Sequence, residues 1–295
     1  MKKTNKVCYI MSSKNKPVLF VNQNERFSFL AKDCYSNNLK SEKDFFTKEM
    51  WPTVNPATGP VYVEGTKPGQ ILKVDIIKIK TMDFAVMCVE RGAGALADKI
   101  KGVETKIIPI RNNKLLINKK VSIEISPMIG VIGTAPKGKG MPTGTPGEHG
   151  GNMDCKNITE GVTLYLPVNV KGALLSLGDI HAVMGDGEVC ICGAEVSGEV
   201  ILKAKAIRSK IPTPCVETAD EMIFIGSAKS LDDCEKIVLD KAHKFLVSFL
   251  RLKLNEAARI MSLAGNLGVC QVVDPLKTMK FILPKNILKK LGFKN

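Results

Sequence analysis

The 295-residue sequence contains few of the residues that dominate nucleic-acid-binding and membrane proteins. Aromatic residues make up 5% of the chain, with a single tryptophan, and the 43 basic residues are mostly lysines spread along its length. Proteins that bind phosphates and stack bases favour arginine and clustered aromatics. No apolar run approaches the ~20 residues that a membrane helix needs. We therefore interpret the formal charge of +14 as solubilising lysine and expect neither a nucleic-acid nor a membrane partner.

Cysteine-based sites have little support in the sequence. The nine cysteines are an odd number and form no Cys-x-x-Cys motif, which favours reduced thiols over a disulfide framework or a zinc finger. The start of the chain, MKKTNKVCYIM, lacks the apolar core of a signal peptide, so a cytoplasmic protein is expected. A cysteine nucleophile remains an alternative, but the local sequence singles out no cysteine for that role.

Histidine is also scarce, and two of the three histidines lie in the stretch 142–195 among acidic residues and glycine-rich turns. Asp179 and His181 are two apart, so on a strand their side chains share one face. Imidazole and carboxylate groups are what zinc and similar divalent ions accept when cysteine is absent. The pair is therefore a candidate metal site. The alternative for His181 is a buried core histidine, because Ile180 and Ala182 flank it.

A glycine-rich turn precedes another acidic candidate in this stretch. Asp154 follows Gly150, Gly151 and Asn152, and glycines without β-carbons let a backbone approach a ligand closely. The backbone N–H groups of the two glycines are candidate donors to an oxyanion. Glu195 lies among apolar neighbours, where an unpaired acid is costly to bury, so a metal or a basic group is its expected partner.

Several ordered motifs covering nearly the whole chain resemble the acetamidase/formamidase family of amide hydrolases. They are Asn55-Pro-Ala-Thr-Gly-Pro60, Gly130-Val-Ile-Gly-Thr-Ala-Pro136, Pro142-Thr-Gly-Thr-Pro146, His149-Gly-Gly-Asn-Met-Asp154, Gly178-Asp-Ile-His-Ala182, Gly185-Asp-Gly-Glu-Val189 and Gln271-Val-Val-Asp-Pro275. The resemblance implies a metal-dependent hydrolase that releases ammonia from short aliphatic amides such as formamide and acetamide. Zinc is the expected divalent metal, with calcium as a candidate additional ion.

The resemblance and the residue chemistry together give three sets of candidate site residues. The expected metal ligands are His181, Asp154, Asp33, His149 and Asp179. The expected catalytic carboxylates are Glu195, Glu148 and Asp154. The expected substrate and oxyanion contacts are Gly150, Gly151, Asn152 and Met184, the last standing where family members commonly carry Gln.

In the expected mechanism, a bound metal polarises the amide carbonyl and lowers the pKa of water, while Glu195 or Glu148 moves the proton. The expected partners are a small-molecule amide and further copies of the chain, as a homodimer or higher homo-oligomer. Two alternatives remain open. One is a hydrolase acting on another small C–N substrate, and the other is a non-enzymatic basic binding protein.

Alternating apolar residues predict an α+β fold dominated by antiparallel strands, sandwich- or barrel-like, with two helices near the C-terminus. One unit spanning 1–295 is expected, with two tightly packed halves of about 1–125 and 126–295 as the alternative. Predicted hairpins join 61–63 to 71–79 and 188–196 to 199–207. A polar loop or short helix at 36–48 is expected to border the pocket. Ser230 is expected to cap the first helix and Asn255 the second.

Overall fold

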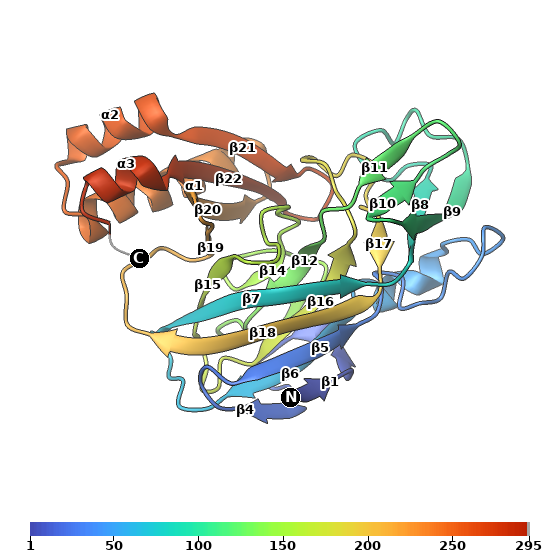
Figure 1. The fold of residues 1–295 in the computed structure, drawn as a ribbon, viewed down its shortest axis with the longest axis horizontal. Helices are drawn as coiled ribbons and strands as arrows, with labels where there is room; N and C mark the ends of the chain where they lie inside the picture. Colours follow the sequence, from blue (N-terminus) through green and yellow to red (C-terminus); the bar gives the residue numbers. More distant parts are fainter. Residues whose placement is uncertain (294–295) are drawn as a thin grey trace.

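The computed structural model describes residues 1–293, which form two large, mainly antiparallel sheets (Figure 1). The first sheet has nine strands, and only its edge pair β1–β5 is parallel. In spatial order its strands are β1 (Lys2–Thr4), β5 (Arg26–Ala31), β18 (Gly198–Ile207), β7 (Ile71–Thr81), β15 (Thr163–Pro167), β19 (Cys215–Glu217), β20 (Glu221–Ala228), β22 (Lys277–Pro284) and β21 (Asn266–Gln271).

The second sheet has eleven strands. Its main path runs through β11 (Ser122–Glu124), β10 (Lys114–Leu116), β9 (Val103–Arg111), β8 (Phe84–Glu90), β17 (Glu195–Val196), β16 (Leu175–His181), β12 (Met128–Gly133) and β14 (Gly150–Asn152). Three more strands belong to it: β6 (Ala57–Val63) pairs with β16, and β2 (Val7–Cys8) and β4 (Leu19–Val21) pair with β6. A small separate sheet pairs β3 (Ile10–Met11) with β13 (Met141–Pro142).

The main hydrophobic core lies between the two large sheets. It joins Phe27 and Leu72 of the first sheet to Ile132 and Leu177 of the second, and all four side chains are fully buried. Each sheet takes strands from both sides of residue 125. The nine-stranded sheet ends at β1 and β21, so within residues 1–293 it is an open sheet and not a barrel. The strand-rich α+β prediction is thereby confirmed.

Both predicted hairpins are wrong for the same physical reason. Strands β6 and β7 belong to different sheets, and so do β17 and β18, because the chain crosses the core at each turn. Alternating burial is the same whether a strand pairs with its sequence neighbour or faces it across a core. In addition, residues 188–194 are irregular and not a strand, with positive φ at Glu188 (49°) and Ile191 (72°).

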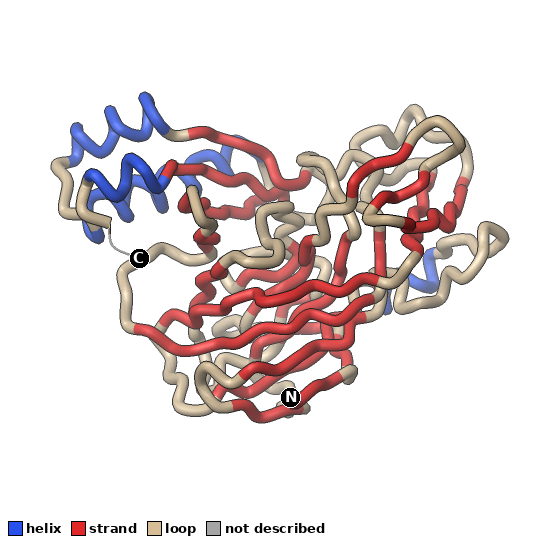
Figure 2. Tube along the Cα trace, in the orientation of Figure 1, coloured by secondary structure: helices blue, strands red, loops and turns tan. Residues whose placement is uncertain are grey.

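The α-helices gather at one end of the molecule, beside β19–β22 (Figure 2). The structure has α1 (Leu231–Lys244), which continues as a π-helical turn over Phe245–Phe249, α2 (Leu254–Ala264) and a short α3 (Lys285–Lys290). The Ser230 side chain accepts from Asp233 N, so the predicted cap of the first helix is confirmed. Lys253, not Asn255, precedes the first turn of α2. No helix in residues 1–293 is long and apolar enough to span a membrane.

The segment between β5 and β6 folds over the second sheet on a small core of its own. Tyr35 and Phe46 are buried there against Cys88 of β8, whose backbone N–H donates to the Tyr35 hydroxyl at 3.2 Å. A 3₁₀ helix, η1 (Lys48–Thr53), ends this segment, which we call the aromatic loop (residues 34–54). The aromatic loop contains the predicted polar loop at 36–48, but apolar side chains hold it against the sheet.

His149 lies buried in the turn before β14, with 4% of its surface exposed. Gly151 has φ of 83° and approaches the imidazole so closely that a β-carbon there would lie 3.0 Å from Nε2. Among the described residues, Nε2 has no hydrogen-bond partner. Burial lowers the pKa of His149 from 6.5 to about 4, so the folded protein holds this ring neutral.

We expect His149→Gln to reduce the loss of folding stability that occurs as the pH falls from 6.5 to about 4. Above pH 6.5 the ring is neutral in both folded and unfolded chains; below it only the unfolded chain gains a proton, so stability falls until about pH 4. The loss corresponds to about 3 kcal/mol. Urea unfolding of both proteins from pH 7 to pH 4 measures it, and a constant difference between the two curves would contradict the assignment.

Candidate active site

The end of strand β16 carries the two residues around which the site is built. Asp179 and His181 point to the same face, and Asp179 Oδ1 lies 3.5 Å from His181 Nε2. The alternation of a strand predicts this arrangement, and the structure confirms it. His181 is fully buried and Asp179 nearly so.

Three further carboxylates surround the same imidazole nitrogen. The distances from His181 Nε2 are 3.0 Å to Glu195 Oε1, 3.9 Å to Glu188 Oε1 and 4.0 Å to Asp154 Oδ1. Glu195 reaches the site from β17, which pairs with β16 so that Glu195 lies opposite His181. Asp154 follows β14, and Glu188 comes from the irregular segment after β16. We call these five residues the carboxylate–histidine cluster.

The backbone at this cluster is held in an unusual conformation. Asp154, Asp179 and Glu188 have φ of 42°, 54° and 49°, in the left-handed region that few non-glycine residues adopt. Such residues persist only where the surrounding structure enforces them, and they gather at functional sites. Gly130 is also required, because a β-carbon there would collide with the carboxylates of both Asp154 and Asp179.

Several polar atoms of the cluster lack hydrogen-bond partners within residues 1–293. They are both carboxylate oxygens of Asp154, Oδ1 of Asp179, both ring nitrogens of His181 and Oε2 of Glu195. Burying such groups unpaired is costly, and like-charged groups add repulsion. Asp154, His181 and Glu188 offer ligand atoms within 4.8 Å of one another, and so do Cys34, Asp179 and Glu195. This donor set fits a divalent cation.

The titration of these groups reflects their burial and their proximity. Burial, together with nearby carboxylates, raises the pKa of Asp154 and Glu188 well above the usual range. Burial alone would lower the pKa of His181, but the carboxylates of Glu195 and Asp179 outweigh it, so this pKa lies well above 6.5. Burial raises the pKa of Glu195 to about 7. Without a cation, the cluster therefore binds protons strongly.

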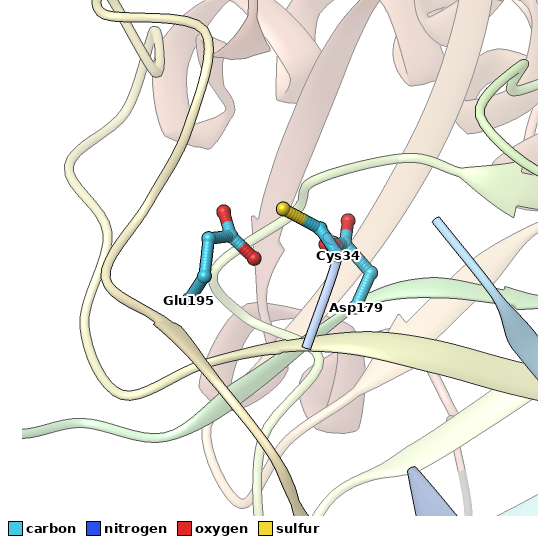
Figure 3. Close-up of side chains that lie close together, drawn as sticks. All are labelled: Cys34, Asp179 and Glu195. Atoms are coloured by element: carbon cyan, nitrogen blue, oxygen red, sulfur yellow. The ribbon is translucent and has the colours of Figure 1, made fainter. Parts of the chain in front are cut away.

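Three residues of the cluster, Asp179, Glu188 and Glu195, line a cavity of about 740 Å³. Figure 3 shows Asp179 and Glu195 pointing toward the Cys34 sulfur, which also lines this cavity. Burial and the same two acids raise the pKa of the Cys34 thiol well above 9. A nucleophilic cysteine needs a thiolate, so this setting does not favour nucleophilic catalysis by Cys34.

Six of the predicted site residues lie outside the cluster and outside the cavity lining that residues 1–293 form: Asp33, Glu148, His149, Gly150, Gly151 and Met184. Asp33 Oδ1 accepts from Asn37 N at 2.7 Å and closes the turn after β5. Glu148 is exposed and pairs with Lys241 at 3.1 Å in a separate groove. Met184 is buried elsewhere. The structure thus separates Glu195 from its predicted alternative, Glu148.

The predicted glycine contacts serve the sheet. Gly150 and Gly151 pair with β12, and the Gly150 N–H donates to Gly147 O, so that amide is not available to an oxyanion. Asn152 does line the cavity, and its Nδ2 donates to Asp274 Oδ2 at 2.8 Å.

Sequence reasoning missed Glu188, Cys34 and Asp274 as site residues. Glu188 and Asp274 stand inside motifs that carry the family resemblance, and that was the available signal. Gln271 Oε1 accepts from Asp274 N at 3.0 Å, which fixes the loop that brings Asp274 to the cavity wall. Nothing in the sequence around Cys34 indicates its position.

Known proteins are similar to this chain in both sequence and fold. The model of the Acetamidase/Formamidase family matches residues 137–230. A formamidase from Methylophilus methylotrophus is 30% identical over 252 residues, which cover 62% of this chain and 61% of that protein. The chain therefore spans less than two thirds of that relative.

Two solved structures match along nearly the full length. The acetamidase from Bacillus halodurans superposes with a TM-score of 0.97 at 40% identity, covering 99% of both chains. A protein described as a predicted acetamidase/formamidase, from Thermoanaerobacter tengcongensis, gives the same score and identity over 100% of this chain and 99% of that one. With this likeness over the whole fold that carries the carboxylate–histidine cluster, the chain belongs to the acetamidase/formamidase family.

Proposed function

We propose that this protein hydrolyses the C–N bond of primary amides to a carboxylate and ammonia. The observation that carries the proposal is the convergence of four carboxylates on His181 Nε2, three of which line a cavity, in a chain of this family. Assembly into a homodimer or higher homo-oligomer, and residence in the cytoplasm, stay predictions from the sequence.

A divalent metal is part of the proposal, and zinc is the ion we expect. His181, Asp154 and Glu188 would hold it, or Asp179 and Glu195 with Cys34, since both sets offer convergent donor atoms. When bound, such an ion polarises a carbonyl and lowers the pKa of water. Its positive charge would also neutralise the carboxylates of the cluster whose oxygens have no hydrogen-bond partner.

Glu195 is the proposed proton carrier. Its Oε1 accepts from Gly193 N at 3.0 Å, which fixes the carboxylate, while Oε2 has no partner in the described chain. Glu195 also lines the cavity, so Oε2 can take a proton from an attacking water and return it to departing ammonia. Asn152, anchored by Asp274, offers an unpartnered Oδ1 beside the same cavity for a substrate amide N–H.

Ammonia release from formamide and acetamide should depend on a divalent metal. We expect turnover by the purified protein to fall to background after chelation and to return when zinc is added back, with metal content measured on the same samples. Turnover that persists in protein free of metal would refute the metal role but leave amide hydrolysis standing. Absence of ammonia release from metal-loaded protein with any primary amide would refute the proposed function.

Replacing one cluster carboxylate should affect metal binding and stability in opposite directions. We expect Asp154→Asn to lower metal stoichiometry, and to raise the stability of metal-free protein by on the order of 1 kcal/mol because an unpaired buried acid is removed. Metal analysis and urea unfolding with a chelator measure both effects. Asp83→Asn, at an exposed acid, is the control and should change neither. Full metal content in Asp154→Asn would contradict the assignment.

The two predicted proton carriers can be separated by activity. Glu195→Gln keeps the shape of the side chain but cannot accept a proton, so we expect kcat to fall by about 10²–10⁴-fold. Glu148→Gln should leave kcat unchanged, because that side chain is exposed beside Lys241. Steady-state kinetics at equal metal content decide between them. The opposite result would move the proton transfer to Glu148.

A further inference from the structure

The cavity above the cluster is much larger than a short amide requires. A molecule such as acetamide, with four heavy atoms, fills on the order of 100 Å³ if each water-sized group takes about 30 Å³. The cavity measures about 740 Å³. Pockets of this size are typical of ligands with a substantial apolar body. A short amide would leave most of the cavity to water.

One wall of the cavity is aromatic and comes from the aromatic loop. The Phe46 ring meets Trp51 edge to face at 4.9 Å and 85°, and it meets Tyr35 at 5.9 Å. All three line the cavity. Phe46 and Tyr35 are buried against β8, whereas Trp51, the only tryptophan of the chain, is half exposed on η1. A rigidly backed Phe46 with an accessible Trp51 forms a surface on which a flat group can stack.

The charged residues of the cavity lining restrict the class of substrate further. Within residues 1–293 its lining holds no lysine, arginine or histidine, although the whole chain carries a formal charge of +14. The lining acids are Glu90, Asp179, Glu188, Glu195 and Asp274. Ile10 and Pro142, from the small β3–β13 sheet, add apolar surface to the lining. Within the described chain, this lining therefore offers an anionic group remote from the cluster no basic side chain to pair with.

We propose that the preferred substrates are uncharged primary amides whose acyl group carries an aromatic ring. The amide lies at the carboxylate–histidine cluster, and the ring stacks on the Phe46–Trp51 pair within the apolar part of the lining. This assignment rests on the proposed function and specifies its substrate class. The aromatic loop then determines specificity, whereas the cluster on β16, β17 and the segment after β14 determines the reaction.

Steady-state ammonia release from acetamide, hexanamide, phenylacetamide and the anionic amide succinamate tests the assignment on the metal-loaded protein. We expect kcat/KM for phenylacetamide to exceed that for acetamide by about tenfold or more, from ring burial and stacking. Hexanamide should fall between them, and succinamate should lie below acetamide. Trp51→Ala should reduce the phenylacetamide-to-acetamide ratio about tenfold, mainly through KM, and Trp51→Phe should restore most of it.

Phe20→Ala removes an equally exposed aromatic ring on β4, outside the cavity, and should leave the ratio unchanged. Circular dichroism and thermal unfolding establish that the variants fold. Acetamide turnover without a preference for phenylacetamide, or a ratio unaffected by Trp51→Ala, would overturn the substrate assignment while the amidase function stands. Loss of turnover with every amide would instead refute the proposed function.

Discussion

Electrostatic repulsion among buried carboxylates is the constraint on which the site depends. Four acids converge on one imidazole nitrogen, and their oxygens find few hydrogen bonds within residues 1–293. One imidazolium cannot neutralise four carboxylates, so the folded chain must either take up protons or bind a cation. The raised pKa values of Asp154, Glu188 and Glu195 express the first response, and the convergent donor atoms permit the second.

The stability of the two-sheet fold offsets the energetic cost of holding the buried carboxylates close together. Asp154 and Asp179 hold left-handed backbone conformations on segments that strand β12 joins, through its pairing with β14 and with β16. Gly130 of β12 lies between them and leaves room for both carboxylates. Because the large core behind β12 and β16 fixes these strands, the repelling groups cannot relax by moving apart. Strain and repulsion at the site are thus offset by apolar burial elsewhere.

Local sequence patterns predicted the features of this structure that depend on residues close together in the chain. The two-residue period placed Asp179 and His181 on one face, and the Ser230 cap and apolar spacing located α1. Pairing between distant strands is not encoded in such patterns, so both predicted hairpins were wrong. The family resemblance singled out Asp154, His181 and Glu195, all of which meet in the cluster, but it also suggested Asp33 and Met184, which do not. Cys34 reaches the site only through the tertiary path of the aromatic loop.

The aromatic loop and the carboxylate–histidine cluster are held by different strands of the structure. The loop packs on β8 through its own small core and contributes rings to the cavity, whereas the cluster rests on β16, β17 and the main core. The half-exposed Trp51 side chain can therefore change with little effect on the strands that hold the carboxylates, since sites with no shared partners contribute independently. Cys34 is the exception, because it starts the loop and also faces Asp179 and Glu195. The loop is thus coupled to the cluster through Cys34, and also through Val86 of β8, which belongs to the core of the loop and pairs with Glu195.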